Sequence, residues 1–293
     1  MDLPTILLLG KNGQVGWELQ RTLAPLGRLW ALDYPEIDFA EPAALRKLVL
    51  DHKPQIVVNA AAYTAVDKAE SEPERALLIN GHAPAALAEA ARQTGALLVH
   101  YSTDYVYDGA KRQPYVETDA PNPLSAYGRS KLVGDEAVQQ AGCDHLIFRL
   151  CWVYGARGQN FLLTMLRLAR ERETLRVVAD QIGSPTWSRL IAEATALALG
   201  QWLRAADRPA LNGVYHLRAG GQASWHAFAS RIVELMPPAE RKCRAVEAIT
   251  TADYPTPARR PVYSVMSCEK LRRTFGLELP DWEQSLRLVL ETP

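Results

Sequence analysis

Three glycines spaced three residues apart follow the first apolar run of the chain and constrain its fold more than any other feature. Residues 6–9 are aliphatic and have the length of a short buried strand. Gly10, Gly13 and Gly16 come next, and residues 15–26 continue with apolar residues at helical spacing. A strand, a glycine turn and a helix in this order are typical of a doubly wound α/β fold. The free N–H groups at the start of such a helix favour an anionic ligand.

The alternation of short apolar runs and helical segments continues to about residue 152. It predicts strands at 5–9, 28–32, 55–59, 97–102 and 145–150, with helices at 42–52, 83–94 and 127–140. Further on, the pattern predicts helices at 160–172 and 188–203, strands at 175–178 and 214–217, and proline-rich loops. We therefore predict a Rossmann-type doubly wound parallel sheet with a smaller α/β substrate-binding domain. The predicted Rossmann domain comprises residues 1–152 and about 188–213. The predicted substrate-binding domain comprises about 153–187 and 214–293.

Composition excludes several classes of protein. The 33 basic and 33 acidic residues cancel, so no net charge attracts nucleic acid or an anionic membrane. The apolar runs are too short for a membrane span or a signal peptide. The four cysteines lack both paired metal-ligand spacing and the density of a disulfide-stabilised protein, which also disfavours a zinc enzyme. We expect a cytoplasmic protein with free thiols and with neither nucleic acid nor membrane as a partner.

The glycine turn predicts a dinucleotide site. Its bare backbone lets a pyrophosphate approach the helix start, and this spacing is the form seen in extended short-chain dehydrogenases. Asp33 follows the second strand, twenty residues after Gly13, where a carboxylate can hold the adenosine ribose hydroxyls and disfavours a 2′-phosphate. The cofactor is NADPH or NADH, and the preference stays open. The predicted cofactor-binding residues are Gly10, Asn12, Gly13, Gln14, Val15, Gly16, Asp33, Asp38, Phe39, Ala60, Ala61, Ala62, Tyr63, Thr64, Tyr127 and Lys131.

A second motif predicts the chemistry. Tyr127 and Lys131 stand four residues apart at a helix start and face the same side. A nearby ammonium stabilises a phenolate and lowers the pKa of tyrosine from about 10, which favours acid–base catalysis. Taken alone, this spacing is frequent by chance and usually marks a surface pair. Here it follows the glycine turn at the expected distance, and Thr103 ends a preceding strand with a hydroxyl for a carbonyl oxygen. The predicted catalytic set is Thr103, Tyr127 and Lys131.

Longer motifs support a family assignment. They lie at residues 10–18, 58–73, 100–106, 127–131, 148–154, 180–186 and 254–261. The most specific are Ala-Val-Asp-Lys-Ala-Glu at 65–70 and Tyr-Pro-Thr-Pro-Ala-Arg-Arg-Pro at 254–261. Through these motifs the chain closely resembles, nearly end to end, the dTDP-4-dehydrorhamnose reductase family of extended short-chain dehydrogenases.

The resemblance implies hydride delivery from the nicotinamide to C4 of dTDP-4-dehydro-β-L-rhamnose, so the expected partner is a dTDP-sugar and the product is dTDP-L-rhamnose. Tyr127 would donate a proton to the nascent alkoxide, Lys131 would adjust the pKa of the Tyr127 phenol, and Thr103 would hydrogen-bond the substrate oxygen. The residues alone also allow a buried core position for Trp152. They allow two solvated loop side chains for Arg259 and Arg260, although the forked donors of arginine suit a diphosphate. The predicted substrate-binding residues are Thr103, Asp104, Trp152, Arg259 and Arg260.

The resemblance also bears on metal binding. Some family members are described as pairing through three carboxylates around a divalent cation. Glu18 and Glu291 could match two of these positions, but Arg189 stands at the third. A cation repels Mg²⁺ and cannot ligate it. We therefore expect no metal, while a homodimer stays open.

Three other functions share parts of this pattern. Sugar-nucleotide 4,6-dehydratases of this group carry Asp-Glu after the threonine, whereas Tyr105 follows Asp104 here, which disfavours dehydration. A 4-epimerase is harder to exclude, because it differs mainly in retaining its cofactor while the keto sugar rotates. The regulatory subunit of methionine adenosyltransferase looks like these reductases but acts as a binding partner, and the catalytic set does not by itself exclude that role.

Overall fold

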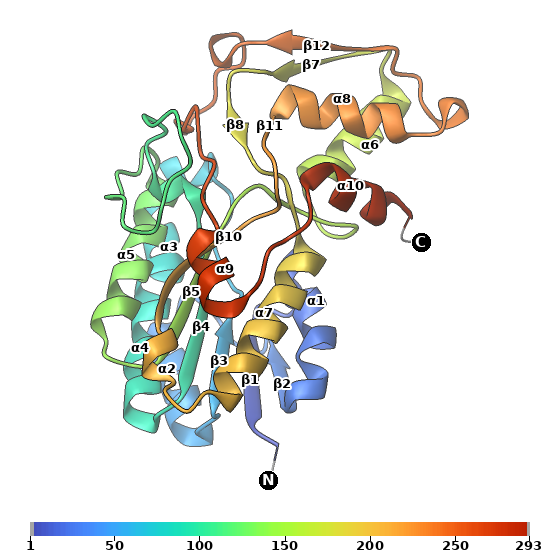
Figure 1. The fold of residues 1–293 in the computed structure, drawn as a ribbon. Coiled ribbons are helices and arrows are strands. Elements are labelled where there is room, and N and C mark those ends of the chain that lie inside the picture. Colours follow the sequence, from blue (N-terminus) through green and yellow to red (C-terminus); the bar gives the residue numbers. More distant parts are fainter. Residues whose placement is uncertain (1–2, 292–293) are drawn as a thin grey trace.

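The computed structural model describes residues 3–291 and contains a six-stranded parallel sheet in the order β10-β5-β4-β3-β1-β2 (Figure 1). Each neighbouring pair is parallel, as connections through helices require. The strands are β1 (Thr5–Leu9), β2 (Arg28–Leu32), β3 (Ile56–Asn59), β4 (Leu97–Thr103), β5 (His145–Leu150) and β10 (Gly213–Leu217).

Helices cover both faces of this sheet. Figure 1 shows α2, α4 and α5 on one face and α1 and α7 on the other. The bounds are α1 (Gln14–Thr22), α2 (Pro42–His52), α3 (Pro73–Leu77), α4 (Ala83–Thr94), α5 (Ala126–Gln140) and α7 (Ser188–Arg204), with a π-helical turn at Leu78–His82 and 3-10 turns at Ala24–Leu26, Lys68–Glu70, Asp104–Val106 and Pro209–Leu211.

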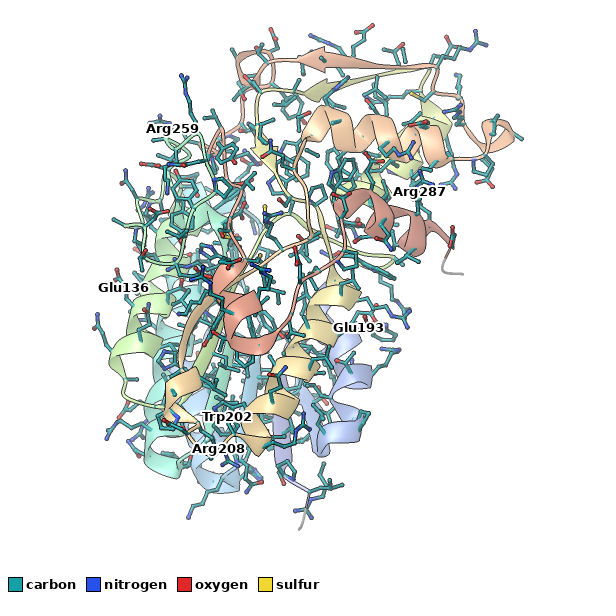
Figure 2. The ribbon with its side chains drawn as sticks, in the orientation of Figure 1. Glu136, Glu193, Trp202, Arg208, Arg259 and Arg287 are labelled. Atoms are coloured by element: carbon teal, nitrogen blue, oxygen red, sulfur yellow. The ribbon has the colours of Figure 1, made fainter. Side chains whose placement is uncertain are left out.

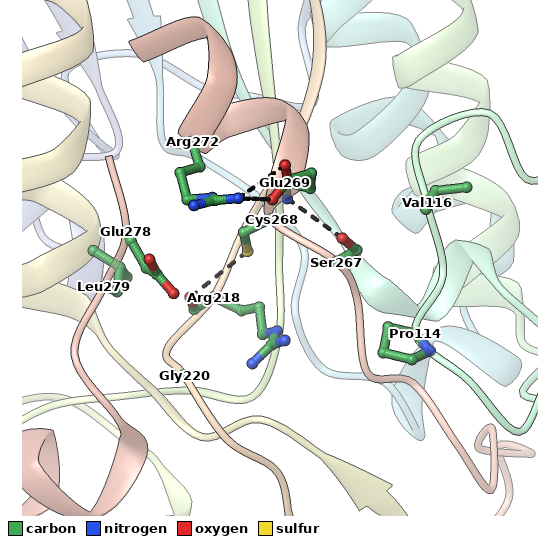
Figure 3. A pocket seen from close by; sticks show the side chains of 10 residues that line it. All are labelled: Pro114, Val116, Arg218, Gly220, Ser267, Cys268, Glu269, Arg272, Glu278 and Leu279. Atoms are coloured by element: carbon green, nitrogen blue, oxygen red, sulfur yellow. Dashed lines mark hydrogen bonds and ion pairs between the residues drawn. The ribbon is translucent and has the colours of Figure 1, made fainter. Parts of the chain in front are cut away.

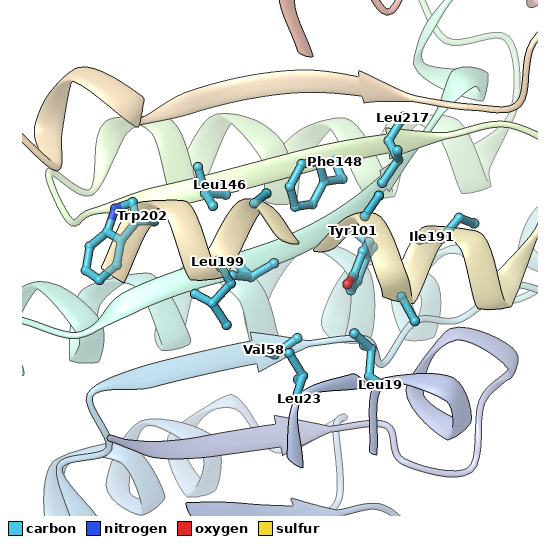
Figure 4. Packing of buried hydrophobic residues seen from close by; sticks show 14 of the residues in the cluster. Leu19, Leu23, Val58, Tyr101, Leu146, Phe148, Ile191, Leu199, Trp202 and Leu217 are labelled. Atoms are coloured by element: carbon cyan, nitrogen blue, oxygen red, sulfur yellow. The ribbon is translucent and has the colours of Figure 1, made fainter. Parts of the chain in front are cut away.

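Two hydrophobic clusters hold these layers together. In β1, Ile6 and Leu8 point into one cluster and Leu7 and Leu9 into the other, because successive strand residues face opposite sides. This explains why the first strand is an unbroken aliphatic run. Figure 4 shows the cluster beneath α1 and α7, where Leu19, Leu23, Val58, Tyr101, Leu146, Phe148, Ile191, Leu199, Trp202 and Leu217 pack together.

A smaller region packs around its own cluster, which includes Leu162, Val177, Phe228, Trp282 and Leu286. Its parallel strands β7 and β12 pair with each other, and two-residue strands form the pairs β6–β9 and β8–β11. The bounds of its elements are β6 (Val153–Tyr154), α6 (Phe161–Glu171), β7 (Thr174–Val178), β8 (Ile182–Gly183), β9 (Thr186–Trp187), β11 (Ala223–Ser224), α8 (Trp225–Leu235), β12 (Ala245–Ile249) and α10 (Trp282–Glu291), with 3-10 turns at Pro238–Glu240 and Thr251–Asp253. Between them in the sequence, α9 (Glu269–Phe275) returns to the main sheet.

Helix starts follow local capping chemistry. Asn160 accepts a hydrogen bond from the N–H of Leu163 at 3.1 Å, and Ser224 accepts one from Ala227 at 3.0 Å. Ser125 does the same for Gly128 at 3.1 Å and so begins α5 beside Tyr127. Each cap satisfies an N–H group that the first helical turn leaves free.

The predicted fold class, a Rossmann-type parallel sheet with a smaller α/β region, is confirmed. The predicted domain boundaries stay a prediction. They place residues 214–293 in the smaller domain, yet β10 pairs with β5 in the main sheet. Leu271 and Phe275 of α9 also pack into the cluster beneath α1 and α7. Within residues 3–291, no helix combines the length and apolarity that crossing a membrane requires.

Candidate active site

A cleft with a volume of about 930 Å³ opens at the carboxyl ends of the parallel strands, where open α/β sheets bind ligands. Residues of α1, β4, α5, β5 and α8 line it, together with the loops that follow β1, β2 and β3, so segments far apart in the sequence meet there. The predicted cofactor residues that line the cleft are Gly10, Asn12, Gly13, Gln14, Val15, Asp33, Phe39, Ala60, Ala61, Ala62, Tyr63, Thr64, Tyr127 and Lys131.

The glycine turn fits a dinucleotide diphosphate. Gly10 has a φ of 85°, and a Cβ there would lie 2.6 Å from the nitrogen of Ala61. Gly13 caps α1 without any side-chain hydrogen bond, which leaves the first-turn N–H groups for an anion. Gly16 does not line the cleft, because it packs behind the turn, where a Cβ would lie 1.9 Å from the Gly10 oxygen.

Asp33 follows β2 and binds the backbone of this turn. Its carboxylate accepts hydrogen bonds from the N–H groups of Asn12 and Tyr34, each at 2.8 Å. A carboxylate oxygen can accept more than one hydrogen bond, so capacity remains for ribose hydroxyls. Asp38 differs from the prediction: it is exposed, accepts from Ala40 N–H at 2.8 Å, and does not line the cleft.

Replacing Asp33 by alanine should weaken NADH more than NADPH. The change removes an acceptor for ribose hydroxyls and a charge that repels a 2′-phosphate. We expect the ratio of KM for NADH to KM for NADPH to rise about tenfold, or about 1.4 kcal/mol. Asp33→Asn keeps one oxygen for the turn and separates the role of charge from that of the acceptor. Equal changes for both cofactors in Asp33→Ala would place Asp33 away from the ribose.

The predicted catalytic residues converge in the same cleft. Thr103 ends β4, and Tyr127 and Lys131 lie on the first turns of α5. The Tyr127 phenol makes a hydrogen bond with the Thr103 hydroxyl. Burial nevertheless raises the pKa of Tyr127 to about 12. The pKa is therefore raised and not lowered as predicted: the Thr103 hydroxyl, rather than Lys131, opposes the shift, and the loss of water around the phenol outweighs it.

Lys131 directs its ammonium toward β4. Its Nζ donates to the Tyr101 carbonyl oxygen at 2.6 Å and lies 3.4 Å from Nε2 of His100. Burial lowers the pKa of Lys131 to about 8. Burial also holds the pKa of His100 well below its usual value, and the Lys131 charge adds to that effect, so this imidazole is neutral. Helical spacing predicted that Tyr127 and Lys131 share one side of the helix. It did not predict that the Tyr101 carbonyl accepts a hydrogen bond from Lys131.

Asp104 lies behind Thr103. Its Oδ1 accepts from the Thr103 hydroxyl and its Oδ2 from the Cys151 thiol, both at 3.1 Å. Burial raises the pKa of Asp104 to about 6, although hydrogen bonds from Ser264, Cys151 and Thr103 oppose this shift. Thr103 also accepts from the N–H of Tyr105 at 3.1 Å. These bonds hold the Thr103 side chain beside Tyr127.

Two tryptophans form an apolar wall at one end of the cleft. Trp152 has a φ of 42°, a strained left-handed conformation for a large residue, and it lines the cleft while its other side packs against a buried cluster. Its ring stacks on Trp225 with centroids 3.5 Å apart and planes 7° apart. A Cβ on Gly183 would lie 2.4 Å from Trp152, so a side chain there would displace the indole. Trp225 was not predicted from the sequence, since no motif or spacing distinguishes it.

The two predicted loop arginines do not line the cleft. Arg260 directs its forked donors at Asp67, with Nη1–Oδ1 and Nη2–Oδ2 distances of 3.0 and 2.7 Å. The predicted diphosphate contact of Arg260 thus differs from its observed partner, because the fork is already matched by a carboxylate. Arg259 is exposed at the surface (Figure 2). The two most specific sequence motifs therefore contact each other through Asp67 and Arg260.

A second cavity, of about 400 Å³, lies beside α9 (Figure 3). Its polar groups largely pair with one another: Arg272 binds Glu269 at 2.8 Å, and the Cys268 thiol lies 3.8 Å from the Arg218 carbonyl. It contains none of the predicted site residues, so the cleft at the strand ends is the candidate active site.

The residues considered for a bridging cation are arranged differently. Arg189 pairs with Glu193 on its own helix at 3.2 Å. Among residues 3–291, no group of three or more histidine, cysteine or acidic side chains is placed to hold a metal. Independence from metal stays a prediction.

A doubly wound parallel sheet, a glycine turn at a helix start and a Thr-Tyr-Lys set in one cleft define an NAD(P)-dependent oxidoreductase of the short-chain dehydrogenase type. Residues 4–292 match the family described as RmlD substrate binding domain, and the chain belongs to that family. The family resemblance predicted from the motifs is confirmed.

Several similar proteins are named dTDP-4-dehydrorhamnose reductase. The chain is 52% identical over 290 residues to a dTDP-4-dehydrorhamnose reductase of Burkholderia thailandensis, covering 97% of each protein. It is 48% identical over 294 residues to that of Escherichia coli K12, covering 97% of this chain and 96% of the relative. A dTDP-4-dehydrorhamnose reductase structure from Bacillus anthracis in complex with NADP has a TM-score of 0.89 and 34% identity, covering 99% of each chain.

Proposed function

We propose that this chain reduces the C4 keto group of dTDP-4-dehydro-β-L-rhamnose to give dTDP-L-rhamnose, with NADPH or NADH as the reductant. The observation that carries the proposal is the meeting of Thr103, Tyr127 and Lys131 in the cleft that contains the glycine turn. Relatives at about half identity over nearly the whole chain bear the name of this reductase.

Each catalytic side chain has a distinct task. The nicotinamide cofactor supplies the hydride that reduces the carbonyl carbon. When the substrate binds, the Thr103 hydroxyl turns its proton from Asp104 to the carbonyl oxygen, and Tyr127 gives its phenolic proton to that oxygen as it becomes an alkoxide. A pKa of about 12 keeps the phenol protonated at neutral pH, which suits a donor. The Lys131 ammonium stabilises the phenolate that remains.

The end of the cleft suits a deoxysugar. Trp152 and Trp225 offer an apolar wall, and Asp104 stands beside the reacting oxygen with a carboxyl of raised pKa. We propose that Thr103, Asp104 and Trp152 contact the sugar, with Trp225 added from the smaller region. Arg259 and Arg260 carry no diphosphate role in this proposal, because Arg260 is paired with Asp67 and Arg259 faces solvent.

We also propose a cytoplasmic enzyme whose partner is a dTDP-sugar, working without nucleic acid, membrane or bridging metal, with a homodimer left open. Support comes from the balanced charge of the chain and from its four free cysteines. The Arg189 cation at the position of the third carboxylate supports independence from Mg²⁺.

Consumption of NADPH tests the reaction. With dTDP-4-dehydro-β-L-rhamnose present, we expect absorbance at the NADPH band to fall in proportion to the dTDP-L-rhamnose formed. A dehydratase or epimerase gives no net oxidation, and a regulatory subunit gives no turnover. Lys131→Met serves as the control for cofactor oxidation that does not depend on the site. Conversion of the sugar without net NADPH loss would contradict the proposal.

A further inference from the structure

A carboxylate is buried one helical turn beyond the catalytic lysine. Asp135 lies on α5 four residues after Lys131, and the two side chains are 0% and 1% exposed. A buried carboxylate is costly unless charged or hydrogen-bonding groups compensate it. The reaction described above uses Lys131 but assigns no task to Asp135.

Arg149 of β5 provides one compensating charge. It is also buried, and its Nε lies 3.1 Å from Oδ2 of Asp135. Its Nη1 donates to the Tyr107 hydroxyl at 2.8 Å, and that hydroxyl lies 2.8 Å from Nε2 of His216. His216 Nδ1 in turn lies 3.1 Å from the Ser267 carbonyl oxygen. The buried polar chain therefore extends from the cleft to β10 and fixes where the Asp135 carboxylate stands.

Lys131 provides the other charge. Burial raises the pKa of Asp135, whereas the cations of Arg149 and Lys131 and the Ser102 hydroxyl oppose that shift. The effect is mutual: burial lowers the pKa of Lys131, and the charge of Asp135 opposes that lowering. The groups in direct contact with the ammonium bring no charge, because they are the Tyr101 carbonyl and the neutral imidazole of His100 on β4.

We propose that Asp135 is a positioning residue for the reduction: held by Arg149, its carboxylate keeps the buried side chain of Lys131 charged in the cleft that Tyr127 also lines. The inference rests on the proposed function, because a charged Lys131 matters only if Tyr127 gives up its proton. Without Asp135, Lys131 would be a buried ammonium with only a carbonyl and a neutral imidazole nearby. The unpaired Arg149 cation would then repel it as well.

Asp135→Asn tests the proposal, because the amide keeps the shape of the side chain and removes its charge. Removing an anion disfavours the protonated amine, so the midpoint for Lys131 should move to lower pH by about one unit. An NMR titration of isotope-labelled lysine side chains measures that midpoint without substrate, and Lys131→Gln identifies the signal. In turnover assays, the decline of kcat/KM at alkaline pH should shift in the same direction, with a larger effect on kcat than on KM.

Thr195→Val is the control for a merely structural loss. It breaks a buried hydrogen bond of 2.8 Å to the Tyr101 hydroxyl on the opposite side of the sheet. We expect it to lower stability and to leave the Lys131 midpoint unchanged. Should Asp135→Asn fail to fold, Asp135→Asn combined with Arg149→Met removes both buried charges, which proteins often tolerate. The double variant should still titrate Lys131 at lower pH than the wild type.

An unchanged Lys131 midpoint in either Asp135 variant would overturn the inference, whatever happens to stability. Because the NMR titration needs no substrate, it separates this outcome from failure of the proposed function. A wild-type chain that does not oxidise NADPH with the keto sugar refutes the function. An unshifted lysine in an otherwise active enzyme refutes only the role of Asp135.

Discussion

Replacing Tyr127 by phenylalanine should lower kcat by about 100-fold or more, the scale of a positioned proton donor. The phenol lies in the cleft against Thr103, and its raised pKa keeps the proton available at neutral pH. Phenylalanine retains the ring and removes only the hydroxyl group, with its proton and its hydrogen bond. NADPH affinity should stay close to wild type, because the ring still fills the same space. Steady-state kinetics and NADPH titration by fluorescence measure the two effects.

Tyr215→Phe is the matched control for this variant. Tyr215 is buried beneath α9, and its hydroxyl donates to the Leu211 carbonyl at 2.7 Å, away from the cleft. Losing that bond should cost about 1 kcal/mol of stability and leave kcat unchanged. A Tyr127→Phe enzyme that turns over at close to the parental rate would show that another group donates the proton.

Replacing Gly16 by alanine should destabilise the fold by about 3 kcal/mol, at the upper end for an overpacked site. The added methyl would lie 1.9 Å from the Gly10 oxygen and 3.2 Å from the Cα of Lys11, both in the backbone. No side chain can rotate away, so α1 and the turn must separate. We expect an earlier urea midpoint together with a loss of NADPH affinity of about tenfold or more, because the turn is displaced.

The Gly13→Ala variant separates the loss of stability from the loss of NADPH affinity. Gly13 has a φ of −67°, which alanine adopts, and its added methyl would have only the Gly10 oxygen nearby, at 3.4 Å. We expect stability within about 0.5 kcal/mol of wild type and weaker NADPH binding, because the methyl enters the cleft. If Gly13→Ala destabilises the chain as much as Gly16→Ala, the steric explanation for Gly16 fails.

Features encoded by neighbouring residues were predictable. The strand, glycine turn and helix start of residues 5–16 depend on an aliphatic run, three glycines and helical spacing, and they lie where the sequence places them. The helix predicted to reach residue 26 ends at Thr22, and a 3-10 turn that contains Pro25 follows. Tyr127 and Lys131 share a helix side because four residues make about one turn. Asp33 reaches the turn because it ends the neighbouring strand. Asp38 lies in the loop between β2 and α2 and faces solvent, because hydrophobic periodicity does not predict the direction of a loop side chain.

The sequence by itself therefore determined the parallel α/β fold, the dinucleotide turn, the Thr103–Tyr127–Lys131 set and the family. These follow from short-range backbone preferences and from motifs that are contiguous in the chain. Only the tertiary structure decided that Trp225 stacks on Trp152, that Arg260 pairs with Asp67, and that Arg149 faces Asp135. Each contact joins residues on different elements, and burial there changes the pKa values of Tyr127 and Lys131. Desolvation depends on the complete packing around a group, which no local pattern contains.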